Sequence, residues 1–272
     1  MKFTVKYISD SDLAEAVRVE QETMGNYTYL KDAYELYKHT PGAMVGICDG
    51  EHMAGIGRFT VLPDNTGWLE CLRVSPEYQH MGAGKMIYEE YLKLAEKYHC
   101  TSMAMYTGMK NIKSSSLAEK YGLYTVQVFH GFHIPAEMCA CTPFRRLTPD
   151  EAEVLMQYKE KYHDYLSVSR TFYHFNKENI RSFAAEGMVY GDEESGSLVI
   201  AGARFQHYKT LHAALMEGNT EKCLSFLKTL AYIQGIHDIT FTIASPCSLE
   251  DVLKEYGASM DSAEIIVKEK KF

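Results

Sequence analysis

The chain has 272 residues, of which 46% are hydrophobic and 24% charged, and its formal net charge is −8. This length exceeds one typical domain of about 100–150 residues and predicts two domains. Residues 1–142 carry 13 basic against 17 acidic side chains and residues 143–272 carry 15 against 19, so neither half offers a basic face for nucleic acid.

No apolar run approaches the roughly 18–20 residues of a membrane span, and the first residues lack the apolar core of a signal peptide. We therefore expect a cytoplasmic protein with no membrane partner. The seven cysteines are an odd, scattered set, which is typical of reduced thiols. The nearest pair, Cys139 and Cys141, lacks a second pair at zinc-site spacing, so no metal site is expected.

The first half alternates predicted helices and strands. Ser11 or Asp12 caps a helix whose apolar residues recur through Val19. After it we expect a helix over 30–37, strands over 44–48, 53–61 and 68–74, a long helix with Ile87, Tyr91, Leu94 and Tyr98 on its buried face, a strand at Met103, a helix at Ser114 and a strand over 125–132. The charged residues of the long helix, including Glu90, are expected in water.

Two glycines, Gly82 and Gly84, connect the strand that ends at Val74 to the long helix. Glycine lets the backbone approach a ligand closely, and the unpaired N–H groups of a helix N-terminus, with a partial charge of about +0.5, suit a pyrophosphate. The dinucleotide pattern G-x-G-x-x-G does not match, because Ile87 occupies the position of its third glycine. A Walker loop does not match either, because Met86 follows Lys85 where that loop needs Ser or Thr.

The same segment resembles the acetyl-coenzyme A site of the GNAT superfamily of N-acetyltransferases, whose pattern is L-x-V-x-P-x-[YF]-[RQ]-x-x-G-x-[GA]. The matching residues are Leu72, Val74, Pro76, Tyr78, Gln79, Gly82 and Gly84. His80 and Met81 depart from the family's usual glycine and basic residue at positions that mostly donate backbone N–H groups. A second segment, with Asn111, Ser114, Leu117 and Gly122, resembles the family's next conserved stretch.

The resemblance implies an α/β fold with a mixed sheet and acetyl-coenzyme A as co-substrate. It implies that the pantetheine arm pairs with the strand at Leu72, Arg73 and Val74, where this strand parts from its neighbour. The pyrophosphate would lie on the segment Gln79, His80, Met81, Gly82, Ala83, Gly84 and Lys85, with Asn111 and Ser114 nearby.

The catalytic groups are less well defined by the sequence. Ala118 stands where the family usually has a tyrosine that protonates the thiolate, so Tyr121, Tyr106 or a water would have to serve. Freeing the lone pair of an amine with a pKa of ~10.4 near pH 7 costs about 4.6 kcal/mol, which makes a base useful. Glu70 is the candidate base; the alternative is a structural carboxylate that pairs with Arg73 or a neighbouring strand, and strand alternation would turn it from the site.

Cys71 is expected to be an inert core thiol rather than an acyl-carrying nucleophile. The aromatic clusters at 27–29 and 172–175 are interpreted as core or interdomain residues in preference to a ligand pocket.

The second half repeats the order of elements. We expect helices over 150–165, 177–186, 220–234 and 249–256 and strands over 188–190, 198–208, 211–216, 239–243 and 264–268. Between its central strand and long helix stand only Glu217, Gly218 and Asn219, with Thr220 as the expected cap. The sequence therefore predicts tandem GNAT-like domains: residues 1–142 with the cofactor site, and 143–272 as a degenerate copy without it.

The expected activity is direct transfer of an acetyl group to a primary amine of a small molecule or peptide. The alternatives are a non-catalytic acyl-coenzyme A sensor or scaffold, and an interaction protein without a ligand. Neither the acceptor nor the oligomeric state follows from the sequence.

Overall fold

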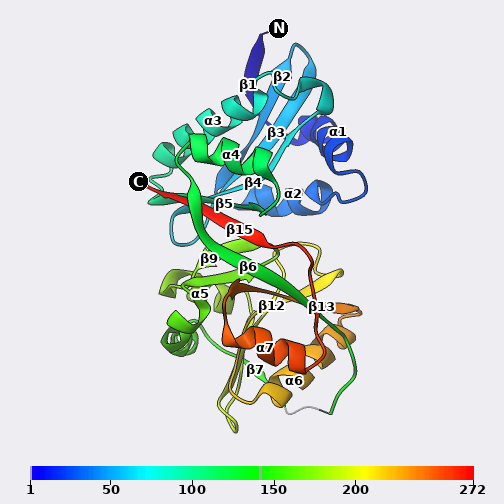
Figure 1. Ribbon diagram of the computed structural model, residues 1–272, viewed down its shortest axis with the longest axis vertical. Helices are drawn as coiled ribbons and strands as arrows, with labels where there is room; N and C mark the ends of the chain where they lie inside the picture. The colour runs from blue at the N-terminus through cyan, green and yellow to red at the C-terminus, as the bar shows by residue number, and fades with distance from the viewer. Residues whose placement is uncertain (1, 141–142) are drawn as a thin grey trace. The chain divides into compact units, whose positions relative to one another are not determined.

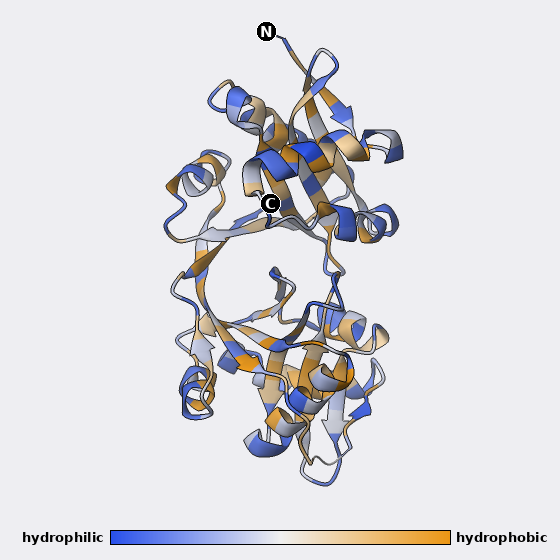
Figure 2. Cartoon of the chain, turned by 90° about the vertical axis from the view of Figure 1, so that its right-hand side faces the viewer, coloured by the Kyte–Doolittle hydropathy of each residue, from blue (hydrophilic) through white to orange (hydrophobic). Residues whose placement is uncertain are grey.

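The computed structural model describes residues 2–140 and 143–272, which form two compact units. The first comprises residues 2–107, 111–126 and 268–272, and the second comprises residues 108–110 and 127–267. Among these residues no helix is long and apolar enough to cross a membrane. In each unit the hydrophobic residues lie mainly on the strands and on the helix stretches that face them (Figure 2).

The first unit contains a mixed sheet with the strand order β1-β2-β3-β4-β5-β15. Strands β1 to β4 pair antiparallel, and β4 pairs parallel with β5. The strands are β1 (Phe3–Tyr7), β2 (Gly42–Asp49), β3 (His52–Val61), β4 (Thr66–Val74), β5 (Ser102–Gly108) and β15 (Ile265–Lys271); the helices are α1 (Leu13–Met24), α2 (Leu30–His39), α3 (Ala83–Lys97) and α4 (Ile112–Lys120).

Helices cover both faces of this sheet, with α3 and α4 on one side and α1 and α2 on the other (Figure 1). The predicted core face of α3 is confirmed, since Ile87, Tyr91 and Leu94 are fully buried. The prediction for Glu90 is wrong. This residue is buried because β1 covers it, and it accepts hydrogen bonds from the Tyr7 hydroxyl at 2.5 Å and from Lys93 at 2.9 Å.

Helix α3 approaches β3 closely because β3 has a glycine beneath it. A Cβ atom at Gly57 would lie 2.1 Å from the Tyr91 hydroxyl and 2.7 Å from Cγ2 of Ile87. The hydroxyl of Tyr91 in turn reaches the backbone oxygen of Glu70 on β4 at 3.4 Å. Gly57 thus determines how near the helix lies to the strands that carry the candidate site.

The second unit contains a mixed sheet with the order β6-β13-β12-β11-β10-β7, and β14 pairs with β6. Its strands are β6 (Tyr124–Pro135), β7 (Arg145–Arg146), β10 (Val189–Asp192), β11 (Ser197–Gly202), β12 (Thr210–Glu217), β13 (Asp238–Ser245) and β14 (Ser259–Met260). Its helices are α5 (Lys177–Ala185), α6 (Thr220–Ile233) and α7 (Ser248–Glu255), and a separate hairpin consists of β8 (Tyr165–Val168) and β9 (Thr171–His174).

Two predictions for the second unit are wrong. The helix expected over 150–165 is instead two 3₁₀ segments, Glu151–Tyr158 and Glu160–Tyr162, which end where His163 and Asp164 adopt positive φ. The hairpin β8-β9 follows and turns at Ser169 and Arg170, whose φ angles of 51° and 55° fit a type I′ turn. The strand expected over 198–208 ends at Gly202.

The compact units divide at residues 126 and 127, within β6. Strands β6 and β15 each contribute residues to both units. Residues 268–272 return to the first unit, where Lys268 bonds Glu119 of α4 at 2.6 Å and the N–H of Phe272 donates to the oxygen of Thr101 at 3.0 Å.

Replacement of Gly57 by alanine is expected to destabilise the first unit by about 1–3 kcal/mol, because the new methyl group overpacks the contact between α3 and β3. Gly108→Ala is the matched control: a Cβ there meets no atom within 4 Å and φ is not positive. Urea unfolding followed by circular dichroism measures both variants. Equal midpoints for the two variants would contradict this account of α3.

Candidate functional site

The candidate site begins where β4 and β5 separate. Their parallel ladder runs from Thr66 paired with Ser102 to Leu69 paired with Met105. Beyond Leu69, β4 continues to Val74 and remains paired only with β3, through Ile56 opposite Arg73 and Gly55 opposite Val74. The backbone of β4 on its β5 side is therefore released over 70–74, as the resemblance implied.

A bulge in β4 decides which side chains face which layer. Cys71 has a φ of 60°, and the register between β3 and β4 shifts between Ile56 and Arg58. An extra residue at a bulge breaks the alternation of side chains. Leu69, Leu72 and Val74 consequently all pack into the core beneath α3.

The same bulge changes the interpretation of Glu70. Simple alternation would turn Glu70 away from the site, but the bulge puts it on the α1 and α2 side together with Cys71 and Arg73. On this side Tyr29 lies close enough to Glu70, Cys71, Arg73 and Tyr106 for their charges to act on the Tyr29 phenol. Tyr106 also stacks on Trp68, with ring centroids 6.3 Å apart.

Glu70 is held by the neighbouring strand. Its carboxylate is buried and accepts a hydrogen bond from Thr60 Oγ1 at 2.6 Å, and Arg58 Nε donates to the same Thr60 oxygen at 3.0 Å. Arg58 lies directly opposite Glu70 in the ladder. The carboxylate thus has a structural partner on β3 and a place beside the released part of β4.

Burial raises the pKa of the Cys71 thiol to about 12. The thiol is therefore protonated near neutral pH, which argues against a nucleophilic role because the thiolate is the reactive form. Burial also raises the pKa of Tyr29 well above its ordinary range, so this phenol keeps its proton.

Sequence reasoning did not identify Glu20 and Tyr29 as parts of this site. Glu20 lies fully buried on α1 and accepts hydrogen bonds from the backbone N–H groups of Tyr29 and Leu30, at 3.1 Å and 3.0 Å. It thereby satisfies the first donors of α2 and holds Tyr29 in place. An acidic residue in an amphipathic helix carries no signal of this contact, since its partner is nine residues away.

The loop after β4 presents backbone N–H groups. Gly82, the N-cap of α3, has a φ of 101°, and His80 has a φ of 66°. No side chain caps α3, and the first helix-donated bonds are those from Lys85 and Met86 to the Gly82 oxygen. Among the described residues the N–H groups of Ala83 and Gly84 thus form an uncapped helix N-terminus, which suits an anion.

The other motif residues surround this helix start. Gly84 permits contact with α4, since a Cβ there would lie 3.2 Å from Leu117 Cδ2. Asn111 caps α4 by accepting from the Ser114 N–H at 3.2 Å. Gln79 Nε2 donates to the Val74 oxygen at 3.3 Å, while the side chain of Met81 is half exposed.

Tyr121 lies at the outer end of this arrangement. Its hydroxyl donates to the Lys85 oxygen at 3.1 Å, and its ring stacks on Tyr88 with centroids 4.8 Å apart. Ala118 is fully buried. Tyr121 therefore joins α4 to the first turn of α3, whereas Tyr106 is the tyrosine whose charge would act on Arg73 and Tyr29.

The corresponding junction in the second unit is closed by its own side chain. The N-cap of α6 is Asn219, not Thr220, and its side-chain oxygen accepts from the Lys222 N–H at 3.0 Å. Gly218 has a φ of 93° and fits a tight turn, because a Cβ there would lie 2.7 Å from the Ser197 backbone. At this helix start a cap side chain thus binds a first-turn N–H group, whereas no side chain does so at α3.

Across residues 2–140 and 143–272, no three His, Cys, Asp or Glu side chains are grouped to hold a metal ion. Cys139 is a free thiol, whereas Cys141 lies outside the described residues.

Comparison with known proteins agrees with this geometry. Residues 10–123 match the sequence profile of the Acetyltransferase (GNAT) family. A search of curated protein sequences finds no significant match.

Solved structures match over almost the whole chain. A GCN5-related N-acetyltransferase from Sphaerobacter thermophilus has 11% identity and a TM-score of 0.65, covering 99% of this chain and 95% of that one. One from Kribbella flavida has 14% identity and a TM-score of 0.56, covering 99% and 71%. The glucosamine N-acetyltransferase region of a fungal multi-domain β-N-acetylglucosaminidase has 13% identity and a TM-score of 0.70, covering 99% and 38%.

At these identities the structural matches establish the fold, and the sequence profile supplies the family. Residues 10–123 therefore belong to the Acetyltransferase (GNAT) family, and the chain over almost its full length has the mixed α/β fold of these solved structures.

Proposed function

We propose that this protein transfers an acetyl group from acetyl-coenzyme A to a primary amine of a small molecule or peptide. The observation that carries the proposal is the uncapped N-terminus of α3 behind Gly82, next to two parallel strands that separate after Leu69. An anion binds at such a helix start, and an extended chain can pair with the released backbone of β4.

The residues of the first unit fit coenzyme A. The N–H groups from Gln79 to Lys85 would hold the pyrophosphate, and the backbone of Leu72, Arg73 and Val74 would pair with the pantetheine arm. Asn111 has already used its side-chain oxygen as a cap, so its amide nitrogen is the group available to a ligand. Ser114 lies one helical turn further on. We assign the cofactor site to domain 1–142 alone, and residues 143–272 to a degenerate copy, because the Asn219 side chain already binds the Lys222 N–H at the start of α6.

In the proposed reaction a base first takes one proton from the ammonium of the acceptor. The free amine then attacks the thioester carbonyl, so that a C–N bond forms and the C–S bond breaks, and the nitrogen loses a second proton while the departing thiolate gains one. Glu70 is the proposed base, directly or through water, because the bulge puts it on the same face as Arg73. For the returning proton, the position of Tyr106 favours it over Tyr121, whose hydroxyl is bound to Lys85.

One alternative has a specific observation in its favour. Glu70 is hydrogen-bonded to Thr60, and Ala118 replaces the usual tyrosine. A sensor or scaffold that binds acyl-coenzyme A would need the α3 loop. It would need neither a general base at Glu70 nor a general acid at position 118.

Gly82→Ala is expected to weaken acetyl-coenzyme A binding by about tenfold, because alanine disfavours a φ of 101° and would turn the N–H groups of the loop. Titration calorimetry measures affinity and stoichiometry, expected to be one per chain. Gly50→Ala is the control, since Gly50 has a φ of 61° and open space but lies in the β2-β3 turn. Equal effects of the two variants, or two molecules bound per chain, would overturn the assignment.

Glu70→Gln is expected to lower kcat by about 10²-fold or more near pH 7, with partial recovery at higher pH as more of the amine is free. Cys71→Ser serves as a control for disturbance of the bulge and is expected to retain activity. The test is the rate of acetylation between pH 6 and 9. A Glu70→Gln profile identical to that of the native protein removes Glu70 from the mechanism.

Turnover itself is tested by the release of free thiol from acetyl-coenzyme A in the presence of an amine panel. The panel includes peptides with a free N-terminus, lysine, polyamines and, because of the fungal structural match, glucosamine. We expect thiol release that depends on at least one amine. Tight binding of acetyl-coenzyme A without release from any amine would favour the sensor instead.

A further inference from the structure

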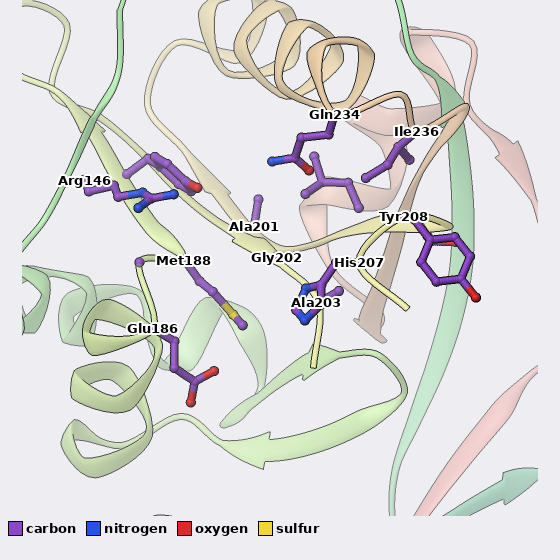
Figure 3. Close-up of a pocket in the computed structure, with 14 residues that line it drawn as sticks. Arg146, Glu186, Met188, Ala201, Gly202, Ala203, His207, Tyr208, Gln234 and Ile236 are labelled. Carbon is purple, nitrogen blue, oxygen red and sulfur yellow. The ribbon is translucent and has the colours of Figure 1, made fainter. Parts of the chain in front are cut away.

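A cavity of about 430 Å³ lies in the second unit, at the end of α6 opposite to Asn219. This volume falls within the range of small-molecule sites. Its floor is apolar and consists of the end of β11, the start of β12 and Ile236, with Ala201, Ala203 and Leu211 almost fully buried (Figure 3). None of these residues belongs to the proposed acetyl transfer site.

Arg146 is a charged group on the cavity wall without a counter-ion among the described residues. Arg145 and Arg146 are consecutive residues of β7, so they point to opposite faces. Arg145 binds Glu151 through two hydrogen bonds, at 2.8 Å and 3.1 Å, and binds Glu193 at 2.7 Å. Arg146, which lines the cavity, forms no ion pair within the described part of the chain.

The guanidinium of Arg146 is nevertheless held in place. It lies 6.0 Å from the centroid of the Tyr190 ring, and it lies over Gly187, where an added Cβ would come within 3.2 Å of its Cζ atom. Gly187 has a φ of 72° and follows the end of α5. At the C-terminal end of α5 the positive guanidinium is stabilised by the helix carbonyl groups. Its N–H groups can still bind a carboxylate through two parallel hydrogen bonds.

The cavity also contains groups that attract a cation. Glu186 and Gln234, the C-cap residues of α5 and α6, both line it, so two helix ends bring partial negative charge there. Glu186 accepts one hydrogen bond, from Ser182 at 3.3 Å, and does not pair with Arg146. Figure 3 shows Arg146 and Glu186 on one wall with Met188 between them, and Gln234 and His207 further across the cavity.

We propose that this cavity binds a free amino acid with an apolar side chain, with its carboxylate on Arg146, its ammonium on Glu186 and its side chain over the floor of the cavity. A ligand with a carboxylate but no ammonium would place an apolar group against Glu186. A ligand with an ammonium but no carboxylate would place an apolar group against Arg146. Only a ligand with both charges satisfies both groups when they lose water.

Titration calorimetry of the full chain with L-leucine, without acetyl-coenzyme A, tests the proposal. Two analogues, 4-methylpentanoate and 3-methylbutylamine, each lack one of the two charges. We expect leucine to bind and each analogue to bind about tenfold more weakly or worse. No binding of leucine up to about 10 mM, or equal binding of either analogue, would overturn the proposal.

Variants locate the site, since leucine is also a primary amine, the class of acceptor proposed for the first unit. Arg146→Gln is expected to weaken leucine binding by about tenfold or more, whereas Arg145→Gln, which removes two ion pairs on the opposite face, leaves it unchanged. Unchanged affinity in Arg146→Gln would place leucine elsewhere and overturn the proposal.

Glu186→Gln separates a loss of binding from a loss of folding. It should bring the affinities of leucine and 4-methylpentanoate together, because the group that recognises the ammonium is gone. A folding defect would lower both affinities and preserve their ratio, and a preserved ratio would contradict the role of Glu186. The outcome does not depend on acetyl transfer, so it stands or falls separately from the proposed function.

Discussion

The candidate site depends on the separation of β4 from β5 after Leu69. A parallel pair that continued to Val74 would consume the backbone groups that an extended ligand needs. The separation is coupled to the bulge at Cys71, which brings Leu69, Leu72 and Val74 to the α3 face and Glu70 and Arg73 to the other. The bulge thus lies in the part of β4 that no longer pairs with β5, and it separates the core side chains from Glu70 and Arg73.

The second constraint is whether a side chain caps the N-terminus of a helix. In α4, α5 and α6, an asparagine side chain accepts a hydrogen bond from the first turn: Asn111, Asn176 and Asn219. In α3 that place belongs to Gly82, which has no side chain to compete with a ligand. The difference between the cofactor-binding junction proposed for the first unit and the closed junction of the second therefore rests on the residue at the cap.

The second unit has not simply lost a site. Its sheet and long helix repeat the order of the first unit, yet its cavity lies at the other end of α6, where two helix C-termini, Arg146 and Glu186 meet. The electrostatics of the two helix ends are opposite, since N–H groups attract anions and carbonyl groups attract cations. In the second unit a side chain caps the N-terminus of α6, and the ligand proposed for this unit differs in class because it binds near the C-terminus of the same helix.

The sequence by itself determined the features that depend on neighbours along the chain. The helical period of Ile87, Tyr91 and Leu94, the strand order around them and the glycine run from Gly82 to Gly84 all lie within short windows, and the family resemblance rests on the same segments. Local spacing fixes these features because helix and strand periods act over a few residues.

Tertiary structure alone decided the rest. Cys71, Ser169 and Arg170 adopt positive φ although none of them is glycine or asparagine. Their residue types therefore did not predict the bulge or the hairpin. Three contacts join residues that are not neighbours in the sequence. Glu90 accepts a hydrogen bond from Tyr7, Glu20 accepts one from the first residue of α2, and Lys268 donates one to Glu119. Contacts of this kind depend on which surfaces meet when the chain folds, and that information is not contained in any local pattern.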